Sequence, residues 1–92
     1  MNDVKPYFEY VLLEPVEKKQ ILVSDTSKLE TYGKVVAVGP EVTNTAVGDY
    51  VAFELWDVKD CSINDKKLYT VQESRLILKI PVSWVVAPQV HN

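Results

Sequence analysis

The sequence predicts an all-β protein with one small domain, on three observations. Short runs of β-branched and aromatic residues recur along the chain, whereas helical patterns are nearly absent. Turn-forming residues separate these runs at Gly39-Pro40, at Val47-Gly48-Asp49 and at Asn64-Asp65. The length of 92 residues is enough for one modest core. We therefore expect a small β-barrel or sandwich.

Five strand signals follow one another along the chain: FEYVLLEPV (8–16), KVVAVG (34–39), DYVAFEL (49–55), KLYTVQE (67–73) and RLILKI (75–80). In KVVAVG and DYVAFEL the apolar residues do not alternate cleanly, which favours strands buried on both faces or closed into a barrel. A closed barrel also leaves no exposed sheet edge. The last strand should end at Ile80, because Pro81 has no amide hydrogen to donate.

Two segments fall outside this pattern. The connection over residues 17–32 is long for a compact domain and polar at both ends, yet it contains Ile21, Leu22 and Val23. Such connections are usually functional or disordered. The tail, residues 81–92, contains Trp84 and two valines beside it. Because a buried tryptophan removes about 150–250 Å² from water, we expect the tail to dock on the domain of residues 1–80 or on a neighbouring subunit.

Composition argues against several classes of function. The net charge is −3, and the positive residues are scattered, so no basic face is expected for nucleic acid. No apolar run approaches the roughly 20 residues that span a membrane. The start, MNDVKPYFEY, lacks the apolar core of a signal peptide, so we expect a cytoplasmic protein. Cys61, the single cysteine, cannot form an intramolecular disulfide and has no nearby metal-ligand partner.

The sequence also offers no catalytic constellation. His91, the single histidine, is expected to be a frayed tail residue, and Cys61 lacks a nearby basic partner that would favour the thiolate. The chain has three glycines and no glycine-rich phosphate loop. Acidic pairs near turns are usually solvated charges; those considered are Asp57 with Asp60 and Asp49 with Glu54. We therefore expect no enzyme, no metal site and no cofactor.

Five segments together resemble one family in its own order. They are PYFEYVLLEP (6–15), ILVSDTSK (21–28), YGKVVAVGP (32–40), VGDYVAF (47–53) and SINDKKLYTVQESRLILKI (62–80). The family is that of the GroES-type co-chaperonins, also called 10 kDa chaperonins. The resemblance implies a small GroES-like β-barrel with a mobile loop at about residues 17–31.

The resemblance further implies a lid for a large chaperonin ring that encloses an unfolded client and assists its folding. ATP would be bound by the chaperonin. The apolar tripeptide Ile21, Leu22 and Val23 would insert between helices of the chaperonin, and three such side chains contribute about 3–6 kcal/mol of transfer free energy. From the residues alone, a strand packed on its own core is the favoured alternative, and the resemblance reverses this preference. Weak contacts of this kind gain affinity by repetition around a ring.

The implied assembly is a homo-oligomer, most often a heptamer. In the family, the N-terminal strand of one subunit pairs with the C-terminal strand of the next. Those elements correspond here to residues 4–13 and 76–80. The expected interface residues are Tyr7, Phe8, Tyr10, Leu76, Leu78 and Ile80. For the aromatic residues core packing is the alternative, and a mixture of both is expected.

The chain departs from the family in three places. The connection from Pro15 to Ile21 is short and has Lys19-Gln20 where a glycine pair is common. Between Gly39 and Val47 there is little room for the loop that roofs the ring, so the dome should have a wide opening. The tail has no counterpart. Such shortening would suit a divergent, virus-encoded member that acts in the cytoplasm of a host.

Two alternatives remain open from the sequence. The first is a GroES-like β-barrel module that has lost chaperonin binding, which the short and glycine-poor loop allows. The second is a fragment like the GroES-like N-terminal domain of alcohol dehydrogenases. That domain needs zinc-ligating Cys and His residues and a following dinucleotide-binding domain, and the sequence has neither.

Overall fold

The computed structural model describes residues 4–17, 20–21 and 31–85. These residues form strands joined by short 3₁₀ turns, without an α-helix, so the all-β prediction is confirmed. The strands are β1 (Tyr10–Val16), β2 (Tyr32–Val38), β3 (Tyr50–Ala52), β4 (Lys59–Ile63), β5 (Lys66–Gln72) and β6 (Leu78–Ile80). The 3₁₀ turns are η2 (Leu55–Asp57), η3 (Glu73–Arg75) and η4 (Val82–Trp84).

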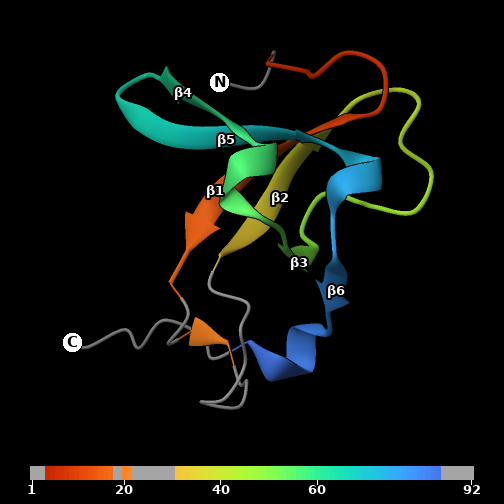
Figure 1. Cartoon of the computed structure of the whole chain (residues 1–92), viewed down its shortest axis with the longest axis vertical. Helices are drawn as coiled ribbons and strands as arrows, with labels where there is room; N and C mark the ends of the chain where they lie inside the picture. Colours follow the sequence, from red (N-terminus) through yellow and green to blue (C-terminus); the bar gives the residue numbers. More distant parts are fainter. Residues whose placement is uncertain (1–3, 18–19, 22–30, 86–92) are drawn as a thin grey trace.

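The strands build one antiparallel sheet with the order β4-β5-β1-β2-β3-β6, which curls so that its two halves lie at a steep angle to each other (Figure 1). Within the described residues β4 and β6 do not pair. The expected full closure is therefore not seen, and these two strands are the edges of a barrel-like sheet. A free edge presents unpaired backbone groups to a partner.

The main core lies inside the curl of the sheet. Its seven buried residues come from β1, β2, β3 and β5 and from the residue after β3: Val11, Leu13, Val35, Val51, Phe53, Tyr69 and Val71. The rings of Phe53 and Tyr69 meet edge to face with centroids 5.6 Å apart. A register shift opposite Leu12 and Leu13 bends the β1–β2 ladder. Val51, Ala52 and Phe53 are consecutive and all buried, which explains why the apolar residues of DYVAFEL do not alternate cleanly.

The strand bounds differ from the sequence prediction for local reasons. The first strand begins at Tyr10 rather than Phe8, because Phe8 has a positive φ of 53° in a turn that the Tyr10 amide closes onto the Tyr7 carbonyl at 3.0 Å. The final strand is shorter than predicted because η3 includes Arg75. It ends at Ile80, as Pro81 predicts.

β4 was not predicted. Its sequence, KDCSI, has little β-branched or apolar character, and it lies at an edge where only one neighbour holds it. The predicted turn at Asn64-Asp65 is confirmed, because both residues have positive φ and connect β4 to β5 in a two-residue hairpin. The sequence therefore predicted the Asn64-Asp65 turn but not β4, the strand that precedes it.

Candidate functional site

The predicted partner-binding residue Ile21 is buried in the structure. It is 4% exposed and belongs to a second apolar cluster with Tyr32, Ala52 and Ile80, which is separate from the main core. Leu22 and Val23 lie outside the described residues. The role of the three residues in binding a chaperonin stays a prediction, but the burial of Ile21 must be part of any account of it.

Hydrogen bonds hold the described residues at both ends of the connection that carries Ile21. At its start, the Gln20 amide donates to the Glu17 carbonyl at 2.9 Å, and the Glu17 amide donates to the Gln20 side-chain oxygen at 3.1 Å. At its end, the Thr31 hydroxyl donates to the Phe53 carbonyl, and the Phe53 amide donates to the Thr31 carbonyl. Ile21 thus directly follows a residue that is hydrogen-bonded to Glu17.

The tail reaches the same cluster. Beyond Pro81, η4 turns the chain, and Val85 then forms an isolated antiparallel bridge with Ile21. Val85 also packs against the cluster. Trp84, expected to drive docking of the tail, remains 49% exposed. Within the described tail the residue that docks is therefore Val85. Nothing in the sequence indicates that this valine, rather than another valine of the tail, makes the contact.

The predicted interface residues fall into two groups. Tyr7 and Phe8 are 78% and 56% exposed, and Tyr10 and Leu78 are exposed as well. In contrast, Leu76 packs against the main core and Ile80 is buried in the second cluster. The exposed group lies just before β1, at its first residue and on the edge strand β6, so these side chains are free to meet another subunit.

A groove runs beside the exposed aromatic residues. It has a volume of about 900 Å³, and its lining is mainly apolar, with Val4, Pro6, Tyr7, Leu12, Ala37, Val38, Pro40 and Val47 among its residues. The N-terminal segment, residues 4–9, forms one wall. It is held where the Gly39 amide donates to the Tyr10 carbonyl and the Glu41 amide donates to the Phe8 carbonyl, at 2.9 and 3.0 Å.

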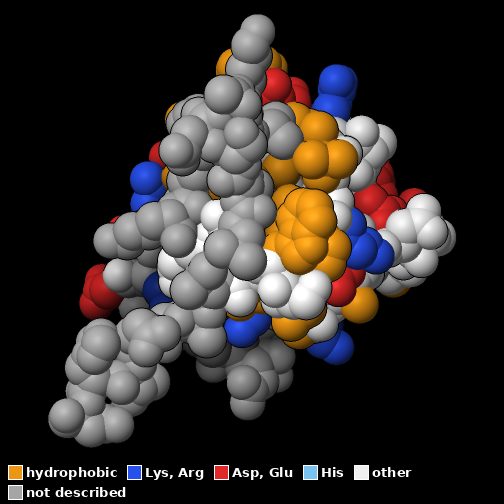
Figure 2. Space-filling view, turned by 90° about the horizontal axis from the view of Figure 1, so that it is seen from below, with side chains coloured by type: hydrophobic (Ala, Val, Ile, Leu, Met, Phe, Trp, Pro, Cys, Tyr) orange, Lys and Arg blue, Asp and Glu red, His pale blue; other side chains and the backbone are white. Residues whose placement is uncertain are grey.

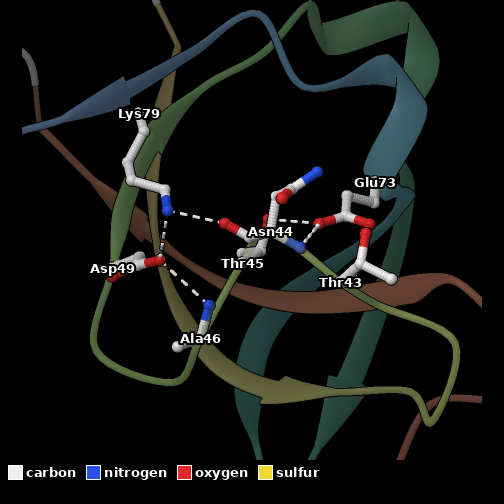
Figure 3. Close-up of polar contacts among 7 residues, drawn as sticks. All are labelled: Thr43, Asn44, Thr45, Ala46, Asp49, Glu73 and Lys79. Atoms are coloured by element: carbon white, nitrogen blue, oxygen red, sulfur yellow. Dashed lines mark hydrogen bonds and ion pairs between the residues drawn. The ribbon is translucent and has the colours of Figure 1, made fainter.

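The shortened second loop, residues 40–48, folds back onto η3 (Figure 3). The carboxylate of Glu73 accepts hydrogen bonds from the amides of Thr43 and Asn44, at 3.2 and 2.8 Å, and from the Thr45 hydroxyl at 2.9 Å. Partial burial raises the pKa of Glu73. The three hydrogen bonds and the Lys79 ammonium outweigh this effect, so the pKa of Glu73 lies below the ordinary value of a glutamate.

Lys79 on β6 ties the other side of this loop. Its ammonium donates to the Asn44 carbonyl at 2.6 Å and lies 3.4 Å from the Asp49 carboxylate, which in turn accepts the Ala46 amide at 2.9 Å (Figure 3). Glu73 thus holds the loop at residues 43–45, and Lys79 holds it at Asn44 and at Asp49. The sequence analysis missed this set, because its signal, Glu73 and Lys79 near a loop 28 to 35 residues earlier in the chain, is only visible in three dimensions.

The described residues also bear on catalysis and membranes. They contain no group of three or more His, Cys, Asp or Glu side chains that could hold a metal ion. Cys61 is a partly exposed free thiol on β4. Within the same residues no helix is long and apolar enough to cross a membrane.

Comparison with known proteins identifies the family of this chain. The sequence model of the chaperonin 10 kDa subunit family matches residues 3–80, which include every described strand. The chain belongs to this family. Among curated members, it is 36% identical over 83 residues to the co-chaperonin GroES of Ehrlichia canis (strain Jake), covering 75% of this chain and 88% of that protein. The co-chaperonin GroES of Ehrlichia chaffeensis (strain ATCC CRL-10679 / Arkansas) matches with the same identity and coverage.

The family match covers the strands but not the tail. The match ends at residue 80, the last residue of β6, so the tail that brings Val85 to Ile21 lies beyond it. The chaperonin 10 kDa relationship therefore covers the sheet and not the tail contact.

Proposed function

We propose that the protein is a co-chaperonin that caps an ATP-driven chaperonin ring and thereby assists protein folding. The family match over residues 3–80 carries this proposal. Two of its relatives are themselves named co-chaperonin GroES. The protein would act in the cytoplasm, on an unfolded client enclosed between lid and chaperonin.

The proposed contact is the tripeptide Ile21, Leu22 and Val23, which would enter an apolar groove of the chaperonin. The transfer free energy of such side chains is a few kcal/mol at most, about 3–6 for all three. Binding through one loop would therefore be weak. A ring that presents several copies would bind tightly through effective concentration and could still be released. The chaperonin would bind the ATP that drives the cycle, so this chain needs no cofactor of its own.

The exposed apolar residues support the proposed ring. Tyr7 and Phe8 face outward before β1, and the edge strand β6 has a partner, β3, on only one side among the described strands. Pairing the N-terminal segment of one subunit with β6 of the next would cover both. Such a contact joins different surfaces of identical subunits, so it forms a ring when the rotation between neighbours closes, and not a two-fold dimer.

The burial of Ile21 favours a second candidate, a GroES-like module without chaperonin binding. A side chain that is 4% exposed cannot enter a groove on another protein without first leaving its own cluster. In this second reading the tripeptide serves only the domain's own packing.

Size-exclusion chromatography with a purified chaperonin would separate the two candidates. We expect the protein to co-elute with the chaperonin in the presence of ATP and to elute separately without nucleotide. Absence of co-elution under both conditions, with a chaperonin that binds its own co-chaperonin in the same buffer, would favour the module.

A further inference from the structure

The burial of Ile21 conflicts with chaperonin binding, if the proposed function is right. Ile21 would then be part of the chaperonin contact, yet its side chain is buried in the free subunit and cannot reach a partner. Its side chain is buried beside Tyr32, Ala52 and Ile80, which belong to β2, β3 and β6. These three residues are fixed by the sheet. Binding to a chaperonin therefore requires Ile21 to exchange one apolar environment for another.

The tail supplies the part of this environment that the sheet does not. Pro81 ends β6, and the next residues form one tight turn, in which the Trp84 amide donates to the Pro81 carbonyl at 2.9 Å and the Val85 amide to the Val82 carbonyl at 3.0 Å. The turn directs Val85 back to Ile21. Figure 1 shows η4 and residues 20–21 at the same end of the molecule, below the ends of β1 and β2.

The contact between tail and loop is small. Ile21 and Val85 form an isolated bridge rather than a ladder of several residue pairs. Val85 is only partly buried, and the residues before it are exposed, with Val82 at 67%. Figure 2 views the molecule from this end and shows apolar side chains gathered on its surface. A contact with so few buried groups can open without unfolding the sheet.

We propose that the tail is an intramolecular latch: Val85 covers Ile21 in the free subunit and competes with the chaperonin for it. The closed latch keeps an aliphatic side chain from solvent while no chaperonin is present. It also lowers the apparent affinity for the chaperonin, because only the open fraction of subunits can bind. If about nine subunits in ten are latched, opening the latch tightens binding at each loop about tenfold.

The affinity test uses the full chain with Val85→Ser, which removes the apolar cover. The matched control is Val82→Ser, the same change three residues earlier at an exposed side chain. Val85→Thr, which keeps the shape of valine, is a milder second variant in case the serine variant folds poorly. We expect Val85→Ser and Val85→Thr to bind the ATP-loaded chaperonin more tightly than wild type, by up to about tenfold, and Val82→Ser to match wild type.

A second measurement reports on the latch without a chaperonin. Hydrogen exchange in a peptide that contains Ile21, followed by mass spectrometry on the free protein, should be faster in both Val85 variants than in wild type and unchanged in Val82→Ser. Exchange in peptides from β1 and β5 should stay the same in all variants, which shows that the sheet is intact.

The outcomes separate the latch from the proposed function. Faster exchange with tighter binding supports the latch. Unchanged exchange, or faster exchange with equal or weaker binding, overturns it, and in the latter case the tail positions the loop instead of competing for it. If wild type and variants alike fail to bind a chaperonin, the proposed function fails and the competition with it, while the exchange data still show whether Val85 holds Ile21.

Discussion

Glu73 is the residue on which the conformation of the shortened second loop depends. Its carboxylate accepts hydrogen bonds from two backbone amides and one hydroxyl of the loop. Hydrogen bonds to an ionised group are stronger than those between neutral groups. Glu73 therefore fixes one side of the loop, while Lys79 and Asp49 fix the other.

Replacing Glu73 with glutamine should lower the free energy of unfolding at neutral pH by about 1 kcal/mol, because a neutral acceptor replaces an ionised one. The pKa of Glu73 is lowered in the folded state, so its stabilising effect is fully present above the ordinary pKa of a glutamate. It declines as the pH falls through the lowered pKa of the folded state. Urea unfolding of both proteins from pH 7 down to pH 3 would measure this.

The matched control is Glu41→Gln, which removes the same charge from an exposed position in the same loop. It should change stability little at any pH. A constant difference between wild type and Glu73→Gln across the whole pH range would show that the carboxylate charge is not what holds the loop.

Gly39 limits how the N-terminal segment can lie. A Cβ atom at this position would be 2.2 Å from the Phe8 carbonyl oxygen and 2.8 Å from that of Tyr7, and neither backbone atom can move without the segment. We expect Gly39→Ala to destabilise the fold by about 2 kcal/mol or more. Gly48→Ala, with no atom within 4 Å but a φ of +98°, should cost only about 1 kcal/mol of backbone strain. Chemical denaturation would rank the two, and an equal or reversed ranking would contradict the close approach at Gly39.

At the scale of elements, the sequence predicts what depends on local chemistry. The strands rich in valine, tyrosine and leucine, and the Asn64-Asp65 turn, are readable because propensity and packing agree there. β4 is not readable, because pairing with β5 rather than its own side chains makes it a strand. The site divides in the same way. Tyr7 and Phe8 are exposed, and their place in an interface stays a prediction. Ile21 is buried among Tyr32, Ala52 and Ile80, which come from three different strands, so its burial is visible only in three dimensions.

The tripeptide loop offers a test at this scale. We expect Leu22→Ser to reduce chaperonin capture, because it removes an aliphatic side chain from the proposed contact. Ile21→Ser should do the same and also lower the free energy of unfolding by about 2 kcal/mol, since Ile21 is buried in the free subunit. Co-elution with a chaperonin and thermal melting would measure the two effects.

The control for this loop is Leu55→Ser, the same kind of change at an exposed leucine on η2. It should leave both capture and melting unchanged. If Ile21→Ser melts like wild type, the second apolar cluster does not depend on Ile21; if Leu22→Ser is captured as well as wild type, the tripeptide is not the contact.

At the scale of the whole molecule, the isolated subunit is incomplete on its surface. It presents an edge strand, an apolar groove of about 900 Å³ and two outward aromatic rings before β1. Apolar surface of this kind on a small soluble domain usually marks an interface. The subunits of a ring would cover these features in one step, and the shortened second loop, held close to η3, would leave the middle of the dome open.

Phe8 gives the most direct test of that ring. It is 56% exposed and has a φ of 53°, which is unfavourable for an aromatic residue and is accepted readily by asparagine. A residue with a strained backbone and an exposed side chain gains little within its own subunit, so its packing should come from a neighbour. We expect wild type to sediment as a homo-oligomer of seven subunits at micromolar concentration. Phe8→Asn should shift this equilibrium toward smaller species while the far-ultraviolet circular dichroism spectrum stays that of a folded β-protein. Trp56→Asn, which alters an exposed aromatic residue on η2 that belongs to neither the N-terminal segment nor β6, should sediment as wild type does. A monomeric wild type, or a Phe8→Asn variant that assembles as tightly as wild type, would refute this arrangement of the subunits.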